Sequence, residues 1–485
     1  MTVEEFYRSM RGKKVAFCGL GGSNLPLAKL LARAGARVTG RDRRTEERLG
    51  GTARELKALG VRLVTGEGYL DGMDEDVIFR TPGMKFHLPQ LEAARARGAA
   101  VTSEMEVFFD VCPCKILGVT GSDGKTTTTT VIAEILRAAG HTVHVGGNIG
   151  EPLLPRAGEM RPDDLVAAEL SSFQLISMRR SPQTAVVTNL SPNHLDVHKD
   201  MREYIDAKRN ILLHQNAFGR AALNADNAIA ASFAEDVRGQ CLTFSRRRAV
   251  PFGAWMGPNG DIWFSRPGRK DVRVMNARDI RIPGLHNVEN YLAAICAVWG
   301  LAGPEEIVRV ARAFPGVPHR NEFVREVDGV RYYNDSIGTT PSRTIRGALS
   351  LFDRKILLIA GGYDKNIPFD PLGPAVVQKV KTLVLLGAAA PKIEAAVKAA
   401  PGWREGNPLI LHAGSLEEAV ALCRAHAAPG DVVSLSPACA SFDMFPSFEA
   451  RGEHFRGIVN GMEQRGRAPA ALPPKKGTKT NQQLC

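Results

Sequence analysis

Residues 115–128 read Lys-Ile-Leu-Gly-Val-Thr-Gly-Ser-Asp-Gly-Lys-Thr-Thr-Thr, an apolar run that leads into a glycine-rich turn and a lysine. The apolar run predicts a buried strand over 115–119, and the pattern that follows predicts a helix over 127–139. A strand, a glycine turn and a helix in this order are typical of α/β domains with a parallel sheet. This stretch therefore fixes the fold class of the middle of the chain.

The turn itself has the composition of a phosphate-binding loop. Gly121 and Gly124 let backbone N–H groups approach phosphate oxygens at a helix N-terminus. Lys125 is placed to reach the terminal phosphates of a nucleotide, and the Thr126 hydroxyl to ligate Mg²⁺. The strict GxxxxGK[ST] spacing is not met, because Val119 stands where its first glycine would be. We interpret the turn as a variant phosphate loop.

Two later strands end in side chains that suit a metal site. Glu169 follows the apolar run 165–168, and a run over 185–188 leads into a loop that carries His194, Asp196 and His198. Ligands bind at the carboxyl ends of strands in such sheets, so Glu169 and His194 are candidate Mg²⁺ contacts. An acid that caps the following helix and a surface histidine are the structural alternatives.

Lys208 stands in an unusual place on a predicted helix over 201–215. One face of that helix has apolar residues three and four apart with the lysine at its centre: Met201, Tyr204, Ile205, Lys208, Ile211 and Leu212. Either the lysine extends its amine to solvent, or the amine is held in a functional site. The pattern alone leaves both readings open.

The N-terminal segment resembles a dinucleotide-type βαβ unit. A strand precedes the glycine-rich turn 19–24, and a second strand ends at Asp42. Asn24 replaces the third glycine of that pattern, so an unspecialised crossover is as good a reading as a nucleotide site. Arg43 and Arg44 favour a phosphate-bearing ligand, since guanidinium groups match phosphate oxygens.

Length and composition limit the class of protein. The chain has 485 residues, 44% of them hydrophobic, which suits about three folded domains. We expect boundaries that give domains over 1–113, 114–317 and 318–464, followed by a basic, disordered tail over 465–485. The apolar runs after 318 repeat the parallel α/β pattern.

Charge and cysteine usage exclude several functions. The net charge is +12, but the tail contributes five positive charges and no acid, and the pattern predicts no nucleic-acid partner. The eight cysteines are scattered, and Cys112-Pro-Cys114 fits neither a redox CxxC pair nor a zinc ribbon. No apolar run is long enough for membrane insertion. We expect a cytoplasmic protein with reduced thiols that is a monomer.

Several motifs together resemble the ATP-dependent muramyl (Mur) ligases. They are Thr120-Gly-Ser-Asp-Gly-Lys-Thr-Thr, Glu169-Leu-Ser-Ser-Phe-Gln-Leu, Asn189-Leu-Ser-Pro-Asn-His-Leu-Asp, His286-Asn-Val-Glu-Asn, His319-Arg, Asn334-Asp-Ser, Gly361-Gly-Tyr-Asp-Lys and Ser436-Pro-Ala-Cys-Ala-Ser-Phe-Asp. The resemblance spans about 12–460. Its last two blocks and the Ser-Ser-Phe-Gln stretch look most like the D-glutamate-adding member.

That resemblance implies an α/β protein of three domains: an N-terminal Rossmann-like domain, a central P-loop-type ATPase and a C-terminal Rossmann-like domain. It implies a ligase whose substrates are ATP, UDP-N-acetylmuramoyl-L-alanine and D-glutamate, with an acyl phosphate as intermediate. This would be a step of peptidoglycan biosynthesis. It further implies two Mg²⁺ ions and a carbamylated lysine at Lys208.

Residue roles carry over from the family motifs as expectations. ATP would be bound by Ser122, Asp123, Gly124, Lys125, Thr126, Thr127, Thr128, Asn287, Asn290, Arg320 and Asp335. The metal ions would contact Thr126, Glu169, His194 and the carbamate of Lys208. The UDP-linked substrate would contact Gly22, Ser23, Asp42, Arg43, Arg44 and Asn148. D-Glutamate would contact Thr339, Lys365, Ser441, Phe442 and Phe448.

The chain departs from the family pattern at a few points. Ile337 stands where some relatives carry a lysine, and Gly22 and Asn24 make the first turn atypical. The alternative functions are a ligase that adds another amino acid and a folylpolyglutamate synthetase. The Asp-Asn-Pro-Arg motif of diaminopimelate-adding members is absent from the sequence.

Overall fold

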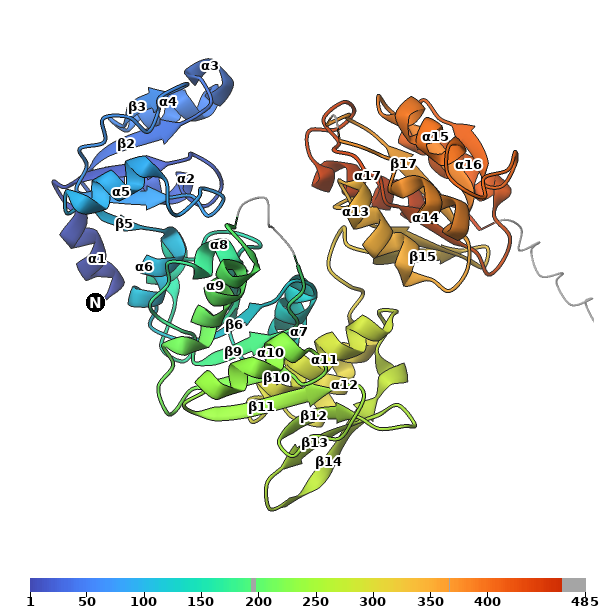
Figure 1. The fold of residues 1–485 in the computed structure, drawn as a ribbon, viewed down its shortest axis with the longest axis horizontal. Helices are drawn as coiled ribbons and strands as arrows, with labels where there is room; N and C mark the ends of the chain where they lie inside the picture. Colours follow the sequence, from blue (N-terminus) through green and yellow to red (C-terminus); the bar gives the residue numbers. More distant parts are fainter. Residues whose placement is uncertain (193–197, 366, 465–485) are drawn as a thin grey trace, which may run out of the picture. The chain divides into compact units, whose positions relative to one another are not determined.

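A computed structural model describes residues 1–192, 198–365 and 367–464. The chain forms two compact units, Met1–Phe314 and the residues from Pro315 onward. The first unit contains two sheets and the second unit contains one (Figure 1). The predicted α/β class is confirmed, whereas the boundaries expected near 113, 317 and 464 stay predictions.

The N-terminal sheet is fully parallel, with strand order β3-β2-β1-β4-β5. Its strands are β1 (Lys14–Cys18), β2 (Arg37–Asp42), β3 (Arg62–Thr65), β4 (Val77–Arg80) and β5 (Ala100–Thr102). Its helices are α1 (Val3–Met10), α2 (Leu25–Arg33), α3 (Glu46–Leu49), α4 (Gly51–Ala58), α5 (Pro89–Ala96) and α6 (Glu104–Val111). The strand order reverses between β1 and β4, and such a reversal opens a ligand crevice at the carboxyl ends of the two strands.

The central sheet has the order β14-β13-β12-β11-β10-β9-β6-β8-β7. Its strands are β6 (Lys115–Thr120), β7 (Val143–Gly147), β8 (Leu165–Glu169), β9 (Thr184–Val187), β10 (Arg220–Asn224), β11 (Gln240–Ser245), β12 (Gly253–Met256), β13 (Asp261–Arg266) and β14 (Arg269–Asn276). Its helices are α7 (Lys125–Ala138), α8 (Ser172–Leu175), α9 (Met201–Leu213), α10 (Ala228–Ser232), α11 (Leu285–Val298) and α12 (Pro304–Ala313), with short 3₁₀ turns η1 (Leu154–Glu159), η2 (Phe233–Asp236) and η3 (Ala277–Asp279).

Parallel pairing at the centre of this sheet positions the candidate site. β6 lies between β8 and β9, and both neighbours run parallel to it. These strands are almost entirely buried, as near-continuous apolar runs in a sheet covered on both faces should be. Their carboxyl ends therefore meet at one edge, immediately before α7.

The outer strands β12, β13 and β14 form an antiparallel extension that the sequence analysis did not predict (Figure 1). The pair Asn259-Gly260, which lies between β12 and β13, is a recognised hairpin signal. Alternation of apolar and polar residues in β13 agrees with one covered face. These strands lack the alternation of strand and helix that marks the parallel part of the sheet along the sequence.

The second unit has a six-stranded sheet of order β15-β16-β20-β17-β18-β19, parallel except for the β15–β16 pair. Its strands are β15 (Glu322–Val327), β16 (Val330–Asn334), β17 (Ile356–Gly361), β18 (Val380–Leu386), β19 (Leu409–His412) and β20 (Val432–Leu435). Its helices are α13 (Pro341–Thr344), the π-helical turn η4 (Ile345–Leu349), α14 (Leu372–Lys379), α15 (Ala390–Lys398), α16 (Leu416–His426) and α17 (Phe448–Asn460).

A buried ion pair stabilises the N-terminal sheet. Arg41 of β2 pairs with Glu75 at 3.0 Å, and both side chains are only 2% exposed. Arg41 also donates to the carbonyl oxygens of Tyr69 and Asp71. The Arg41 guanidinium thus links the loop before β4 to β2. Its N–H groups donate to Glu75 and to the two carbonyl oxygens.

Arg41→Met is expected to lower the free energy of unfolding of this domain by about 3–5 kcal/mol, because Glu75 would stay buried without its partner. The double substitution Arg41→Met with Glu75→Met should recover much of the loss. Urea unfolding of both variants measures the effect. A double variant no more stable than Arg41→Met would contradict this account.

Candidate functional site

The phosphate loop has a backbone that only glycine fits at two positions. Gly121 has φ of +153° and Gly124 has φ of +79°. A Cβ atom on Gly121 would lie 1.9 Å from Oγ1 of Thr188, and one on Gly124 would lie 2.3 Å from Oδ1 of Asn290. The loop is therefore pressed between the end of β9 and α11, with Gly124 as the N-cap of α7.

The segment after β9 holds the loop from the side. The Asp123 amide donates to Oδ1 of Asn189 at 3.0 Å, and Thr188 Oγ1 donates to the Asp123 carbonyl oxygen at 2.6 Å. Ser122 Oγ donates to the Ser191 carbonyl oxygen at 2.9 Å. Thr188, Asn189 and Ser191 thus order the phosphate loop, a role that the sequence did not predict for them. The only signal in the sequence was their position at the end of a predicted strand.

Lys125 and Thr126 are the first two residues of α7, and Thr126 is buried. The Lys125 amine donates to the carbonyl oxygens of Gly121 and Ser122, both at 3.0 Å. Thr126 Oγ1 donates to Oε2 of Glu169 at 2.7 Å, and this carboxylate is 1% exposed. The structure therefore places the first turn of α7, which carries the lysine and the hydroxyl of one motif, beside the acid of another.

Asn148 also reaches this acid. Its Nδ2 donates to Oε1 of Glu169 at 2.8 Å, and its amide donates to the Glu169 carbonyl oxygen at 2.8 Å. The sequence analysis assigned Asn148 to the UDP-linked substrate. The described contact is with the candidate metal ligand, so Asn148 orients Glu169 in this structure.

Lys208 is turned into the protein rather than toward solvent. Its side chain is buried, and Nζ lies 2.9 Å from the Gly121 carbonyl oxygen and 3.2 Å from Thr120 Oγ1. Burial, followed by the nearby charge of Lys125, holds the Lys208 pKa well below its ordinary value. Of the two readings that the sequence left open, the structure excludes the solvent-extended amine.

The predicted ligand His194 and its neighbour Asp196 lie outside the described residues. His198, two positions further on, is buried. Its ring bonds to Ser172 Oγ at 2.8 Å and to Oε2 of Glu203 at 3.1 Å, and it stacks on Phe173. His198 thus joins α8 to α9. Within the described ranges no group of three His, Cys, Asp or Glu side chains forms a metal cluster.

The first turn of α11 completes the loop's surroundings. Thr128 Oγ1 donates to Oδ1 of Asn290 at 3.2 Å, and Nδ2 of Asn290 donates to Oδ1 of Asn287 at 3.0 Å. Both asparagines are buried. Two residues predicted to bind ATP are thus next to the phosphate loop, although they lie more than 150 residues away in sequence.

At the N-terminal crevice, Asp42 and Arg44 form a salt bridge. Asp42 accepts hydrogen bonds from the Leu20 amide at 2.7 Å and from Arg44 Nη2 at 2.9 Å. Burial opposes ionisation, but these donors prevail and lower the Asp42 pKa. Arg43, Gly22 and Ser23 are at least partly exposed, whereas Asn24 is fully buried. Asn24 Nδ2 donates to the Gly19 carbonyl oxygen at 2.9 Å. This side-chain hydrogen bond closes the turn at the position where the dinucleotide-binding pattern has its third glycine.

In the second unit, predicted residues gather at the carboxyl ends of the adjacent strands β16, β20 and β17. Asp335 is buried and accepts from Ser436 Oγ at 2.6 Å and from the Asn321 amide at 3.2 Å. Burial raises the pKa of Asp335 to about 6, and the hydrogen bonds from Ser436 and Asn321 and the charge of Arg320 oppose this only in part. Arg320 belongs to a loop with left-handed residues on either side, His319 and Asn321.

The expected amino-acid contacts lie along the same edge. The Lys365 amine is 3.5 Å from the Thr339 carbonyl oxygen, and Phe442 is 67% exposed beside Tyr363. Ser441 is buried, whereas Phe448 begins α17 and is partly buried. Arg451, which the sequence analysis missed, lies beneath them and donates to the carbonyl oxygens of Ser336, Cys439 and Ala440.

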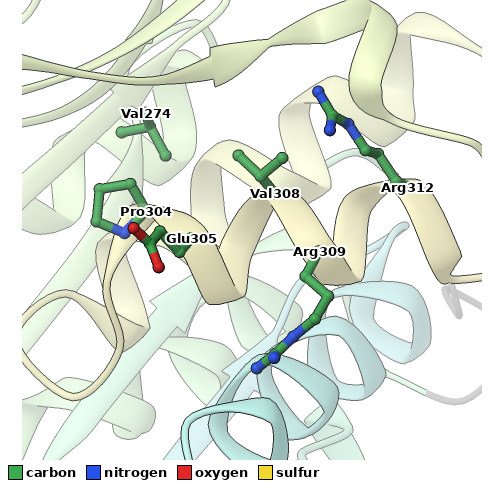
Figure 2. A pocket seen from close by; sticks show the side chains of 6 residues that line it. All are labelled: Val274, Pro304, Glu305, Val308, Arg309 and Arg312. Atoms are coloured by element: carbon green, nitrogen blue, oxygen red, sulfur yellow. The ribbon is translucent and has the colours of Figure 1, made fainter.

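A surface groove on α12 lies apart from this chemistry. Figure 2 shows the groove and its lining residues, Val274, Pro304, Glu305, Val308, Arg309 and Arg312. Arg309 donates to the Ala138 carbonyl oxygen at 2.5 Å. Ala138 is the last residue of α7, about 20 Å along the helix from the phosphate loop. The groove is therefore no part of the candidate site.

Comparison with known proteins decides the family. Residues 119–298 match the Mur ligase middle domain, and residues 319–439 match the Mur ligase, glutamate ligase domain. The chain belongs to the Mur ligase family. Together the two matches contain the phosphate loop, Glu169, Lys208 and Asp335.

Curated relatives match this Mur ligase over nearly its full length. A protein of Acetivibrio thermocellus is 48% identical over 464 residues, covering 95% of this chain and 99% of the relative. A protein of Symbiobacterium thermophilum is 50% identical over 455 residues, covering 93% and 98%. Both are named UDP-N-acetylmuramoylalanine--D-glutamate ligase.

Solved structures support the fold at lower identity. The UDP-N-acetylmuramate-alanine ligase of Thermotoga maritima has a TM-score of 0.56 at 17% identity, covering 92% of this chain and 99% of that one. The pseudomurein peptide ligase type C of Methanothermus fervidus has a TM-score of 0.53 at 18% identity, with the same coverage. Among the described residues, no helix has the length and apolar character of a membrane span.

Asp335 predicts a pH dependence of stability. Its pKa is about 6 in the folded chain and 3.8 for an ordinary aspartate, so the folded state favours the protonated form. Protonation of Asp335 therefore stabilises the folded state, and this contribution is fully present below pH about 4. Up to about 3 kcal/mol of folding stability is lost as pH rises through 6. Asp335→Asn should therefore raise the melting temperature of the second unit much more at pH 7.5 than at pH 4.5, measured by calorimetry. A pH-independent difference would contradict this.

Proposed function

We propose that this Mur ligase joins D-glutamate to UDP-N-acetylmuramoyl-L-alanine with hydrolysis of ATP to ADP and phosphate. The observation that carries the proposal is that Lys125, Thr126, Glu169 and Lys208 all lie around the phosphate loop. Lys125 and Lys208 both donate to the Gly121 carbonyl oxygen, and Thr126 donates to Glu169. The names of relatives that match at 48–50% identity supply the substrates. Such a reaction uses cytosolic nucleotides, so the proposed location is the cytoplasm.

The chemistry requires activation of a carboxylate. A carboxylate is a poor electrophile, so the terminal phosphoryl group of ATP is transferred to it and ADP leaves. The D-glutamate amine then attacks the acyl phosphate, a C–N bond forms, and phosphate and a proton depart. Catalysis is mainly positioning and charge neutralisation, and both suit a lysine beside a phosphate loop.

The described residues fit Mg²⁺. Thr126 Oγ1 and the Glu169 carboxylate lie 2.7 Å apart, and both are oxygen donors. Mg²⁺ in nucleotide sites takes one or two protein oxygens and completes its shell with phosphates and water. Thr126, Glu169, His194 and the carbamate of Lys208 would together hold the two expected ions. Bound there, the ions would neutralise the phosphate charge.

Burial of Lys208 supports its carbamylation. Only the neutral amine attacks CO₂, and the lowered pKa of Lys208 favours that form. The amine adds to CO₂ and releases one proton, which gives an anionic carbamate. The carbamate would face Lys125 and the metal ions. A positive charge on Lys208 is repelled by these cations, whereas the negative carbamate would be attracted to them.

The remaining assignments extend the proposal to the other ligands. The UDP end would be bound at the N-terminal crevice by Gly22, Ser23, Asp42, Arg43 and Arg44. The UDP-linked substrate would also contact Asn148, which lies beside Glu169 in the central sheet. ATP would also contact Asn287, Asn290, Arg320 and Asp335. D-Glutamate would contact Thr339, Lys365, Ser441, Phe442 and Phe448. We propose that the enzyme acts as a monomer.

An amino-acid panel tests the function. With ATP, Mg²⁺ and UDP-N-acetylmuramoyl-L-alanine, phosphate release should depend on D-glutamate, and the product should gain one glutamyl residue by mass spectrometry. Lys125→Ala is the inactive control, with a rate reduced by at least about 10³-fold because it removes the charge that faces the phosphates. Turnover with L-alanine, lysine or a folate but not with D-glutamate would favour the alternative ligases and refute the proposal.

Lys208→Ala tests the carbamate. We expect activity to fall by about 10²-fold or more through loss of a metal ligand, and to return in part when a short carboxylic acid such as acetate or formate is added. Lys199→Ala, in which an exposed lysine is removed, is the matched control and should stay active. A Lys208→Ala variant with a normal rate, or one that no carboxylic acid rescues, would contradict the assignment.

A further inference from the structure

Arg80 is a buried cation at the ligand crevice of the N-terminal sheet. It is the last residue of β4, and its side chain is 1% exposed. The next residue, Thr81, donates its amide to the Cys18 carbonyl oxygen at 3.0 Å and packs on Gly19, directly after β1. Arg80 therefore leaves the sheet where the strand order reverses.

The guanidinium of Arg80 reaches into the central domain. Its Nη2 donates to the Phe173 carbonyl oxygen at 2.9 Å and to Ser177 Oγ at 2.8 Å. Phe173 belongs to α8, and Ser177 follows that helix. The crevice of the first domain is thus joined by two charged hydrogen bonds to a segment that begins three residues after Glu169.

That segment is in turn part of the ATP site. The Leu170 carbonyl oxygen accepts from Thr120 Oγ1 at 2.7 Å, and Thr120 Oγ1 accepts from the Lys208 amine at 3.2 Å. Ser172 bonds to His198, which is fixed to α9. A displacement of α8 would therefore shift Glu169 and Lys208 relative to the phosphate loop.

The rest of the guanidinium has no hydrogen-bond acceptor among the described residues. Nε and Nη1 are buried and make no hydrogen bond to any described residue. One neighbour is the ring of Phe86, 5.4 Å away, and the guanidinium of Arg95 lies over the same ring at 4.1 Å. A buried guanidinium with unused donors is costly unless an acceptor arrives. An anionic substrate in the adjacent crevice would supply such an acceptor.

We propose that Arg80 is a positioning residue that couples binding of the UDP-linked substrate at the β1–β4 crevice to the metal-binding segment of the ATP site. This inference rests on the proposed function. In it, one edge of the guanidinium holds α8 while the free donors face the oxygens of the substrate. Substrate binding then fixes α8, and with it Glu169, for ATP.

Calorimetric titration of a non-hydrolysable ATP analogue with Mg²⁺, with and without saturating UDP-N-acetylmuramoyl-L-alanine, measures this coupling. In the unmodified enzyme we expect the substrate to tighten analogue binding by about five-fold or more. Arg80→Met should bring that ratio to about one. Arg80→Lys should give an intermediate ratio, because an ammonium keeps the charge but not the fork of donors.

Arg95→Met is the matched control. Arg95 faces the same ring, and its Nη2 is likewise buried without a hydrogen-bond partner among the described residues. Its hydrogen bonds go to Glu92 and the Phe86 carbonyl oxygen within its own domain and none reaches α8, so the ratio should stay unchanged. Ser177→Ala serves if Arg80→Met fails to fold, and it should lower the ratio at least about three-fold. A normal ratio in Arg80→Met or Ser177→Ala, or an equal loss in Arg95→Met, would overturn the inference.

The outcomes also separate this inference from the proposed function. An unmodified enzyme that binds the substrate and the analogue with a ratio of one would overturn the coupling and leave the function standing. An enzyme that does not bind UDP-N-acetylmuramoyl-L-alanine at all would overturn the function, and this inference with it.

Discussion

The hydrogen bond between Thr126 and Glu169 is the contact on which the candidate site depends. It joins the first turn of α7 to the end of β8, and Asn148 fixes the same carboxylate from the end of β7. This geometry is possible because β6, β7 and β8 are parallel, so that their carboxyl ends share one edge. A glycine loop between them then exposes its backbone N–H groups where an anion can bind.

The surroundings of this contact explain two features that are unusual in isolation. A lysine in the apolar face of α9 and a threonine-rich start of α7 both lie inside the protein, against the loop. Lys208 is held near Gly121 and Thr120 in a place where its charged form is disfavoured. The same burial that makes a cation costly increases the share of the neutral amine, which is the form that reacts with CO₂.

The two compact units supply different parts of the proposed reaction. The phosphate loop and the residues proposed for the metal ions and for the UDP-linked substrate belong to the first unit, and the residues proposed for D-glutamate belong to the second. In each unit, candidate residues stand at the carboxyl ends of neighbouring parallel strands, as Glu169 does in the first and Asp335 in the second. Arg80 adds a polar connection between the two sheets of the first unit.

The sequence by itself determined the α/β class, the phosphate loop and the acids at strand ends, because strand, glycine turn and helix are local patterns with a fixed physical meaning. It also set Lys208 apart as a charged residue in an apolar stripe. Only the tertiary structure decided that Lys208 points inward, that Asn148 holds Glu169, and that Arg80 reaches α8. These depend on which strands become neighbours, and pairing between distant segments leaves no periodic trace along the chain.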